Sequence, residues 1–202
     1  VDYPGGNDHG SICKIGDQWY IFYHRMTNGT ITSRRGCVEK IQILEDGTIP
    51  QVEMTSLGFD DFLSPYEVTM ADWACVLIGG CFITERNVMT RVVTKITDGC
   101  VIGFRYYEFG EDYSGTSMEI VLQTKGAGCN ARVHIMLDDA KCGTEIGVCN
   151  VGTDSGIYQA RVSNVTGRHA VYLVVEAVEA GEFSQAFEGR HLFDLCSFVF
   201  TK

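Results

Sequence analysis

Short runs of alternating hydrophobic and polar residues recur along the chain, and turn sequences separate them. The alternation is clearest in residues 132–137 and appears again in residues 196–200. A period of two is typical of strands with one buried face, and no stretch of a dozen residues keeps a helical period. Turn pairs such as Asp46-Gly47 and Asp98-Gly99 lie between the runs. The pattern therefore predicts an all-β fold.

The strand-like runs fall into two groups on either side of an acidic segment, residues 59–65. The first group comprises three or four predicted strands, at residues 11–15, 19–24, 32–44 and 50–55. So few strands bury a core poorly, which suggests one blade of a larger propeller or a segment packed on its neighbour. Eight or nine further runs follow from about residue 70, with the regular spacing of a sandwich or jelly roll. We predict a first domain at 1–58, a linker at 59–72 and a β-sandwich at 73–202.

Composition narrows the classes of partner. The chain has 202 residues, 45% of them hydrophobic and 21% charged, and a formal net charge of −10. Such a charge opposes binding to nucleic acid or to an anionic membrane, whereas a neutral sugar is compatible with it. Residues 74–83 form the longest apolar run, too short to span a bilayer. No signal peptide is visible, and we expect the chain to begin partway through a longer protein.

Nine cysteines are present, so they cannot all pair, and no CxxC motif occurs. We expect most of them to be small buried hydrophobic residues rather than disulfide partners.

The first group of strands carries a longer motif. NDHGS at residues 7–11, followed by GDQWYIFYHR at 16–25, resembles the last propeller blade of family 43 glycoside hydrolases, the arabinofuranosidase and xylosidase group. Residues 33–41 and 46–56 are similar to that family's following segments. In the remainder, residues 98–104, 167–173 and 193–200 resemble strands of family 6 carbohydrate-binding modules. The resemblance implies the last blade of a five-bladed β-propeller followed by a β-sandwich (jelly-roll) module.

The function implied by this resemblance is that of a secreted or cell-surface enzyme that degrades plant cell walls. The parent enzyme would hydrolyse α-L-arabinofuranosyl or β-xylosyl linkages with inversion, and the module would bind xylan, arabinoxylan or arabinan. The family's three catalytic carboxylates would precede Val1. Glycosidic cleavage needs an acid and a base held across the bond. We therefore assign no catalytic residue here, and expect upstream blades to be partners.

Two residues of the first group match family positions at the floor of the active site. His9 matches a histidine near the propeller axis, and the alternative is a histidine satisfied by nearby backbone. Arg34 matches an arginine that reaches the floor, where a guanidinium could hold a carboxylate or a sugar hydroxyl. Arg35 points to the opposite face, so either arginine could be the inward one.

Four aromatic residues of the sandwich are candidates for stacking on sugar rings: Phe104, Tyr106, Tyr107 and Tyr158. Aromatic residues on strands are also common in cores, and one of the adjacent tyrosines should face outward. The family's tryptophan-rich loop is replaced by residues 153–157. The alternative is that the sandwich binds no sugar and is a structural domain that braces the propeller.

The resemblance also implies a structural calcium site, in which Asp194 matches an aspartate of the last strand. Calcium prefers six to eight oxygen ligands. The segment 72–76 has no acidic residue at the position where the family has a glutamate. We therefore predict that no tight calcium site is present, name no cofactor as certain and keep calcium as a possible one.

Overall fold

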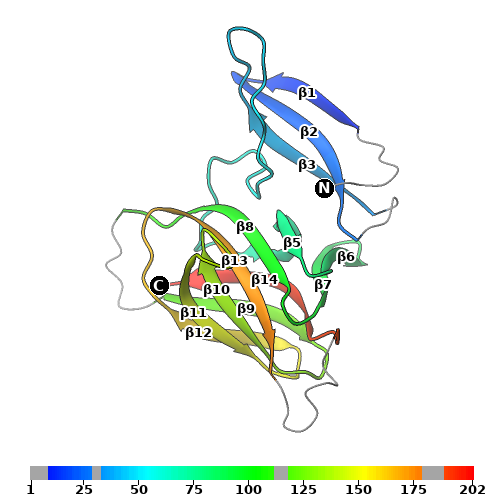
Figure 1. Cartoon of the computed structure of the whole chain (residues 1–202), viewed down its shortest axis with the longest axis vertical. Coiled ribbons are helices and arrows are strands. Elements are labelled where there is room, and N and C mark those ends of the chain that lie inside the picture. The colour runs from blue at the N-terminus through cyan, green and yellow to red at the C-terminus, as the bar shows by residue number, and fades with distance from the viewer. Residues whose placement is uncertain (1–8, 29–32, 112–117, 179–188) are drawn as a thin grey trace.

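The computed structural model describes residues 9–28, 33–111, 118–178 and 189–202 (Figure 1). Within these residues the chain forms strands β1 to β14 and one 3-10 helix, η1, at Ala71–Trp73. The predicted all-β class is confirmed. Residues 7 and 8 of the first motif lie outside the described residues.

Strands β1 (Gly10–Ile15), β2 (Gln18–Met26) and β3 (Arg34–Ile41) form a three-stranded antiparallel sheet, called the blade sheet below. Gly16, with φ +60°, lies in the turn between the first two strands, where glycine avoids the steric cost of a side chain. In Figure 1 this sheet stands above the larger part of the molecule.

The predicted strand at residues 50–55 is wrong, because this segment forms no strand. Polar groups of this segment and of the next residue form hydrogen bonds outside a strand ladder. The Thr55 amide donates to the carboxylate of Glu39, 2.8 Å away, and the neighbouring Ser56 amide donates to the carbonyl of Arg105, also at 2.8 Å. Backbone donors used in this way are not available for a ladder with β3.

The remaining strands form two antiparallel sheets that face each other. The five-stranded sheet has the order β11 (Thr144–Val151), β10 (Ala131–Leu137), β13 (Arg168–Ala177), β8 (Val101–Glu108), β5 (Val76–Ile78). The six-stranded sheet has the order β12 (Gly156–Val162), β9 (Met118–Gly126), β14 (Phe193–Thr201), β7 (Thr90–Ile96), β6 (Phe82–Asn87), and β4 (Thr69–Met70) pairs with β14.

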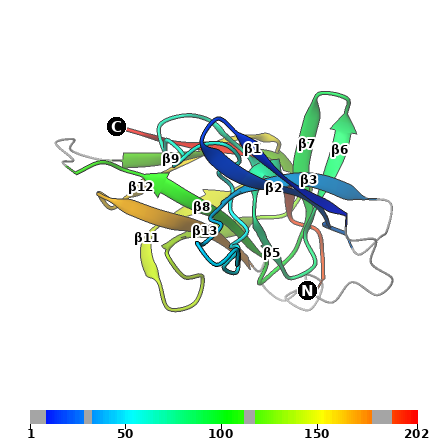
Figure 2. The ribbon, with the colours of Figure 1, turned by 90° about the horizontal axis from the view of Figure 1, so that it is seen from above.

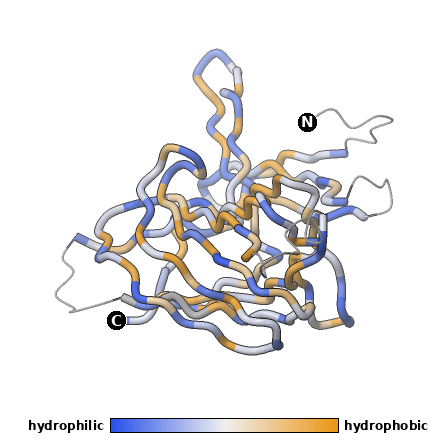
Figure 3. The backbone as a smooth tube through the Cα atoms, turned by 60° about the horizontal axis from the view of Figure 1, so that its bottom comes forward, coloured by the Kyte–Doolittle hydropathy of each residue, from blue (hydrophilic) through white to orange (hydrophobic). Residues whose placement is uncertain are grey.

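The hydrophobic core lies between these two sheets. The alternation predicted for residues 132–137 is confirmed, because Val133, Ile135 and Leu137 are buried while the residues between them are not. Hydrophobic and polar segments alternate along the strands in the same way in Figure 3. Phe104 and Phe198 join the two sheets, with ring centroids 4.9 Å apart in an edge-to-face arrangement.

The segment between the blade sheet and the sandwich follows the surface of the sandwich closely. The Leu63 amide donates to the carbonyl of Tyr106 at 2.9 Å, and the Leu63 carbonyl accepts from Glu108 at 3.0 Å. Further along, the Pro65 carbonyl accepts from the amide of Phe200 at 2.9 Å. The pairing of β4 with β14 thus joins residues 69 and 70 to the sandwich sheet, just before the predicted boundary at 73.

Candidate functional site

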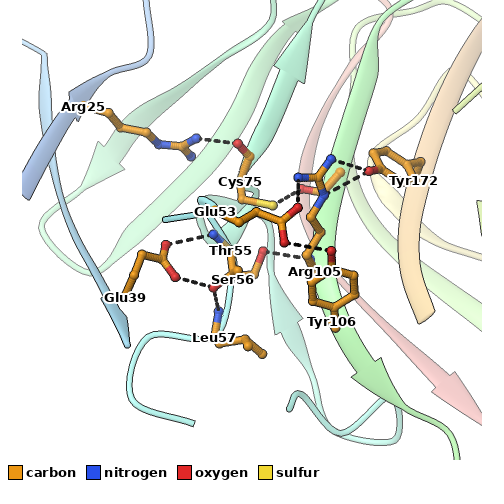
Figure 4. Close-up of polar contacts among 11 residues, drawn as sticks. Arg25, Glu39, Glu53, Thr55, Ser56, Leu57, Cys75, Arg105, Tyr106 and Tyr172 are labelled. Carbon is orange, nitrogen blue, oxygen red and sulfur yellow. Dashed lines mark hydrogen bonds and ion pairs between the residues drawn. The ribbon is translucent and has the colours of Figure 1, made fainter. Parts of the chain in front are cut away.

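A polar junction connects the blade sheet to the sandwich (Figure 4). The guanidinium of Arg25, on β2, donates to the carbonyls of Ala74 and Cys75, the latter at 2.8 Å, and contacts the sulfur of Met54 at 3.2 Å. Backbone carbonyls that would otherwise be unpaired at this edge of the sandwich thus receive a charged donor. Such charge-assisted bonds are stronger than neutral ones.

The carboxylate of Glu39, on β3, is buried within the same junction. It accepts hydrogen bonds from the hydroxyl of Tyr23 at 3.2 Å and from the amide and hydroxyl of Thr55 at 2.8 and 2.5 Å. Burial, together with the neighbouring Cys37 and Glu39, raises the pKa of the Tyr23 phenol well above its usual value. The acceptors of Glu39 are engaged in structural bonds, which makes it a poor candidate for a general acid or base.

Glu53 completes the junction from the other side. Its carboxylate accepts from Arg105 at 2.7 Å and from the hydroxyl of Tyr106 at 2.9 Å. Arg105 also donates to the hydroxyl of Tyr172, at 3.0 Å from Nε and 2.7 Å from Nη2. Burial and the bond to Glu53 raise the pKa of Tyr106. The segment around residue 53 is therefore held against β8 of the sandwich.

The two residues predicted for the active-site floor lie at the same end of the blade sheet. β1 begins at Gly10, which is paired with Tyr23, and Arg34 begins β3 opposite Met26. His9 is exposed, and its ring stacks on His24 with centroids 6.1 Å apart. Arg34 is exposed as well. Their role in an active site stays a prediction.

Arg35, the alternative to Arg34, is committed to the sandwich. Its guanidinium donates to the carboxylate of Glu85 at 2.9 Å and to the carbonyl of Ile83 at 3.4 Å. The hairpin of β6 and β7 stands beside β3 for this reason (Figure 2). Of the two arginines, Arg34 is therefore the one that remains a candidate for the floor.

The prediction that Phe104 and Tyr107 stack on sugar is wrong, because both rings have no exposed surface. Phe104 packs on Phe198, and the hydroxyl of Tyr107 donates to that of Thr69 at 2.9 Å inside the core. The pairing of β8 with β13 shifts register between His169 and Val171. Residues 104 and 107 both face inward as a result, although a regular strand would place them on opposite faces.

Tyr106 and Tyr158 are only partly buried, but they lie on different sheets. Tyr106 faces outward, as predicted for one of the adjacent pair, and the guanidinium of Arg168 lies 5.0 Å from its ring centroid. The hydroxyl of Tyr158 donates to the carbonyl of Asp154 at 2.6 Å, and its ring packs against the core. The four predicted aromatic residues therefore form no common platform.

Asp194 is buried in a pocket filled by the protein's own donors. Arg86 forms an ion pair with its carboxylate, the Thr94 hydroxyl donates to it, and Nε2 of His191 lies 3.2 Å away. Burial and the charge of Arg86 lower the pKa of His191. A cation beside a guanidinium would be repelled, and no group of three or more acidic, histidine or cysteine residues in the described part of the chain could hold a metal. These residues do not fit a calcium ion.

A second charged cluster lies on the outer face of the five-stranded sheet. Nδ1 of His134 is 2.7 Å from Glu145, Nε2 is 3.2 Å from Glu176, and Arg132 pairs with Glu176 at 3.2 Å. Burial lowers the pKa of His134, but the hydrogen bonds and charges of the two carboxylates outweigh it and raise the pKa overall. The cluster links β10, β11 and β13.

Five of the nine cysteines are buried, all nine are free, and this agrees with the prediction that most are small core residues. The thiol of Cys81 donates to the carbonyl of Ile78 at 3.4 Å, and that of Cys100 donates to the carbonyl of Gly79, also at 3.4 Å. The neighbouring Cys81 thiol lowers the pKa of Cys100 to about 5, despite burial.

Sequence reasoning overlooked the aromatic side chains that the structure exposes. In the described residues these are Phe59, Phe62 and Trp73. Phe59 and Phe62 lie in the segment before the sandwich and Trp73 lies in helix η1, where no strand periodicity marks which side chains face outward. Two phenylalanines within the acidic segment 59–65 were the available signal for the first two.

Two curated proteins are similar to this chain in sequence. A xylosidase/arabinosidase of Thermoclostridium stercorarium is 71% identical over 88 residues, which is 44% of this chain and 18% of that protein. An arabinoxylan arabinofuranohydrolase of Paenibacillus polymyxa is 26% identical over 194 residues, 88% of this chain and 30% of that protein. The chain therefore spans less than a third of the length of these relatives. No protein-family model matches it.

Solved structures share the fold of the whole chain and of its sandwich. A family 43 arabinoxylan arabinofuranohydrolase from Bacillus subtilis superimposes on 98% of this chain with a TM-score of 0.65 and 22% sequence identity. The match uses 42% of the length of that enzyme. The resemblance to a family 43 glycoside hydrolase with a family 6 module is confirmed. A family 6 carbohydrate-binding module from Clostridium cellulolyticum, solved with xylose, covers 69% of this chain with its entire length, a TM-score of 0.57 and 23% identity. The family 43 and family 6 likeness thus accounts for the blade sheet and the sandwich together.

Proposed function

We propose that this chain is the C-terminal part of an arabinofuranosidase or xylosidase that acts on hemicellulose. In this proposal the blade sheet closes the enzyme's five-bladed propeller, and the sandwich side of the chain binds xylan, arabinoxylan or arabinan. The observation that carries it is the 71% identity to a xylosidase/arabinosidase over 88 residues. The fold match that spans both parts of the chain supports it.

Hydrolysis is assigned to blades upstream of this chain. The buried carboxylate of the blade sheet, Glu39, accepts structural hydrogen bonds, and the family resemblance places the acid and the base earlier in the sequence. The upstream blades would pack on the blade sheet, where Ile12 and Ile15 of β1 are 45% and 49% exposed. An enzyme that acts on plant cell walls must meet an insoluble substrate, so we place the parent protein outside the cell or at its surface.

The net charge argues against one class of partner. A net charge of −10 opposes nucleic acid. Among the described residues, no helix has the length and apolar character to cross a membrane.

Two measurements on the full chain test this proposal. Affinity electrophoresis in gels that contain xylan, arabinoxylan or arabinan should show retarded migration in at least one polysaccharide. Incubation with aryl arabinoside and aryl xyloside should release no product. A folded chain that none of the three polysaccharides retards would overturn the binding role, and release of product would overturn the absence of catalysis.

A further inference from the structure

Exposed aromatic rings gather at one place on the molecule. In the described residues, Phe59, Phe62 and Trp73 are 54%, 52% and 45% exposed, while every other described Phe, Tyr or Trp ring is buried or partly buried. Leaving large apolar side chains in water is unfavourable, and clusters of them on a surface mark binding sites. The three rings are separated by at most 14 residues of sequence, from 59 to 73.

These rings line two hollows that share residues, and the larger one lies between the blade sheet and the sandwich. The first has a volume of about 450 Å³ and includes Phe59 and Trp73, and the second has a volume of about 250 Å³ and includes Phe62 and Trp73. Asp60, Leu63 and Trp73 belong to both hollows. The two hollows are therefore neighbours, and together they are called the connector groove below.

Trp73 is held in place by its neighbours in sequence. It ends helix η1, and Ala71 two residues before it and Ala74 directly after it are fully buried, with the Ala74 amide donating to the Ala71 carbonyl at 3.2 Å. The backbone that carries the indole is therefore anchored in the sandwich while the ring remains half in solvent. A ring positioned before binding loses little conformational entropy when a ligand stacks on it.

Polar side chains line the same hollows as the rings. Asp60, Ser64, Glu67 and Asp72 line the hollows as acceptors or donors for hydroxyl groups. Aromatic surface with a few polar groups at its edge is the usual composition of a small-molecule site. The carboxylates and the chain's net charge of −10 disfavour an anionic polymer, so an uncharged one fits best.

We propose that the connector groove binds the pyranose rings of a neutral hemicellulose chain, with Trp73 and Phe62 as stacking platforms. The inference rests on the proposed function and gives its binding site a location. The site lies where the blade sheet meets the sandwich, and not on Phe104 and Tyr107 of the core. A polysaccharide bound there would contact both the blade sheet and the sandwich.

Calorimetric titration of the full chain with linear xylo-oligosaccharide and with soluble arabinoxylan tests the site. Trp73→Ala and Phe62→Ala should each weaken binding about tenfold, the loss expected when one stacking contact of about 1.4 kcal/mol is removed. Trp73→Phe keeps a smaller ring and should lose less. Met89→Ala is the matched control, because Met89 is 89% exposed at the β6–β7 turn, outside the groove. Far-ultraviolet circular dichroism confirms that each variant is folded.

The outcomes separate the two proposals. Binding by the wild type that is unchanged in both Trp73→Ala and Phe62→Ala overturns the connector groove and leaves the proposed function intact. No binding by the wild type overturns both. A second copy of the chain is the competing occupant of the groove. Sedimentation would then show a wild-type dimer that oligosaccharide does not affect and that Trp73→Ala converts to a monomer. This result would also overturn the proposal.

Fluorescence gives an independent measurement, because the chain has two tryptophans. In Trp19→Phe the remaining emission comes from Trp73, and oligosaccharide should shift it to shorter wavelength with the affinity that calorimetry gives. Saturable binding in calorimetry without any change in this emission would contradict a role for Trp73.

Discussion

Replacing Arg86 with Met should destabilise the sandwich, because it leaves a buried carboxylate without its cation. Asp194 has 2% of its side chain exposed, whereas Arg86 has 38%. Removing one partner of a buried ion pair costs about 3–5 kcal/mol. Since solvent reaches Arg86, we reduce this to about 2–3 kcal/mol of unfolding free energy, which lowers the Tm by roughly 5–10 °C in a protein of this size.

The matched control is Arg91→Met. Arg91 is 47% exposed and pairs with Glu85 at 3.4 Å and Asp72 at 3.7 Å, so its loss should cost less than about 1 kcal/mol. Adding Asp194→Asn to Arg86→Met should recover part of the loss, because the buried charge is then removed. Urea unfolding followed by fluorescence measures all three free energies.

The same reasoning predicts that calcium has no effect on the wild type. Excess calcium and excess EGTA should give equal Tm values, since a guanidinium occupies the charged side of Asp194. A rise in Tm with calcium, or a Tm for Arg86→Met equal to that of Arg91→Met, would refute this account of the site.

Three further predictions concern other parts of the chain. Arg25→Met should loosen the blade sheet, at a cost of about 1–3 kcal/mol for the unpaired carbonyls, and should accelerate limited proteolysis of residues 42–58, whereas Arg132→Met should not. The raised pKa of His134 stabilises the fold below about pH 6.5, and this contribution disappears as the pH rises through the folded pKa. The Tm difference between wild type and His134→Gln should accordingly be largest at low pH, and a difference that grows with pH would contradict the sign. Cys81 and Cys100 are 4% and 0% exposed, so a thiol reagent should modify them only when the chain is unfolded, and rapid modification of either one in the folded chain would argue against their burial.

The parts of the fold that sequence predicted are those with a local signal. The alternation of residues 132–137 follows from one buried face, and the structure shows it in β10. The turn at Asp98-Gly99 lies between β7 and β8, where Gly99 has φ +74°. Such signals depend on neighbouring residues alone, so they are visible without the tertiary structure.

The predictions that failed depend on contacts distant in sequence. The inward position of both Phe104 and Tyr107 follows a register shift against β13, which nothing near β8 encodes. The segment 50–55 resembles a strand, but its bonds go to Glu39 and the sandwich. Arg86, which neutralises Asp194, comes from the β6–β7 hairpin far away in the chain. The exposed rings of the connector belong to no strand, so periodicity did not reveal them.

The central claim is that this chain binds hemicellulose without cleaving it, and affinity electrophoresis in gels of arabinoxylan tests it most directly. The wild type should migrate more slowly than a non-binding reference protein as the polysaccharide concentration rises, and the arabinoxylan around it should stay intact. Unchanged migration of a folded chain in arabinoxylan, xylan and arabinan alike would contradict the account.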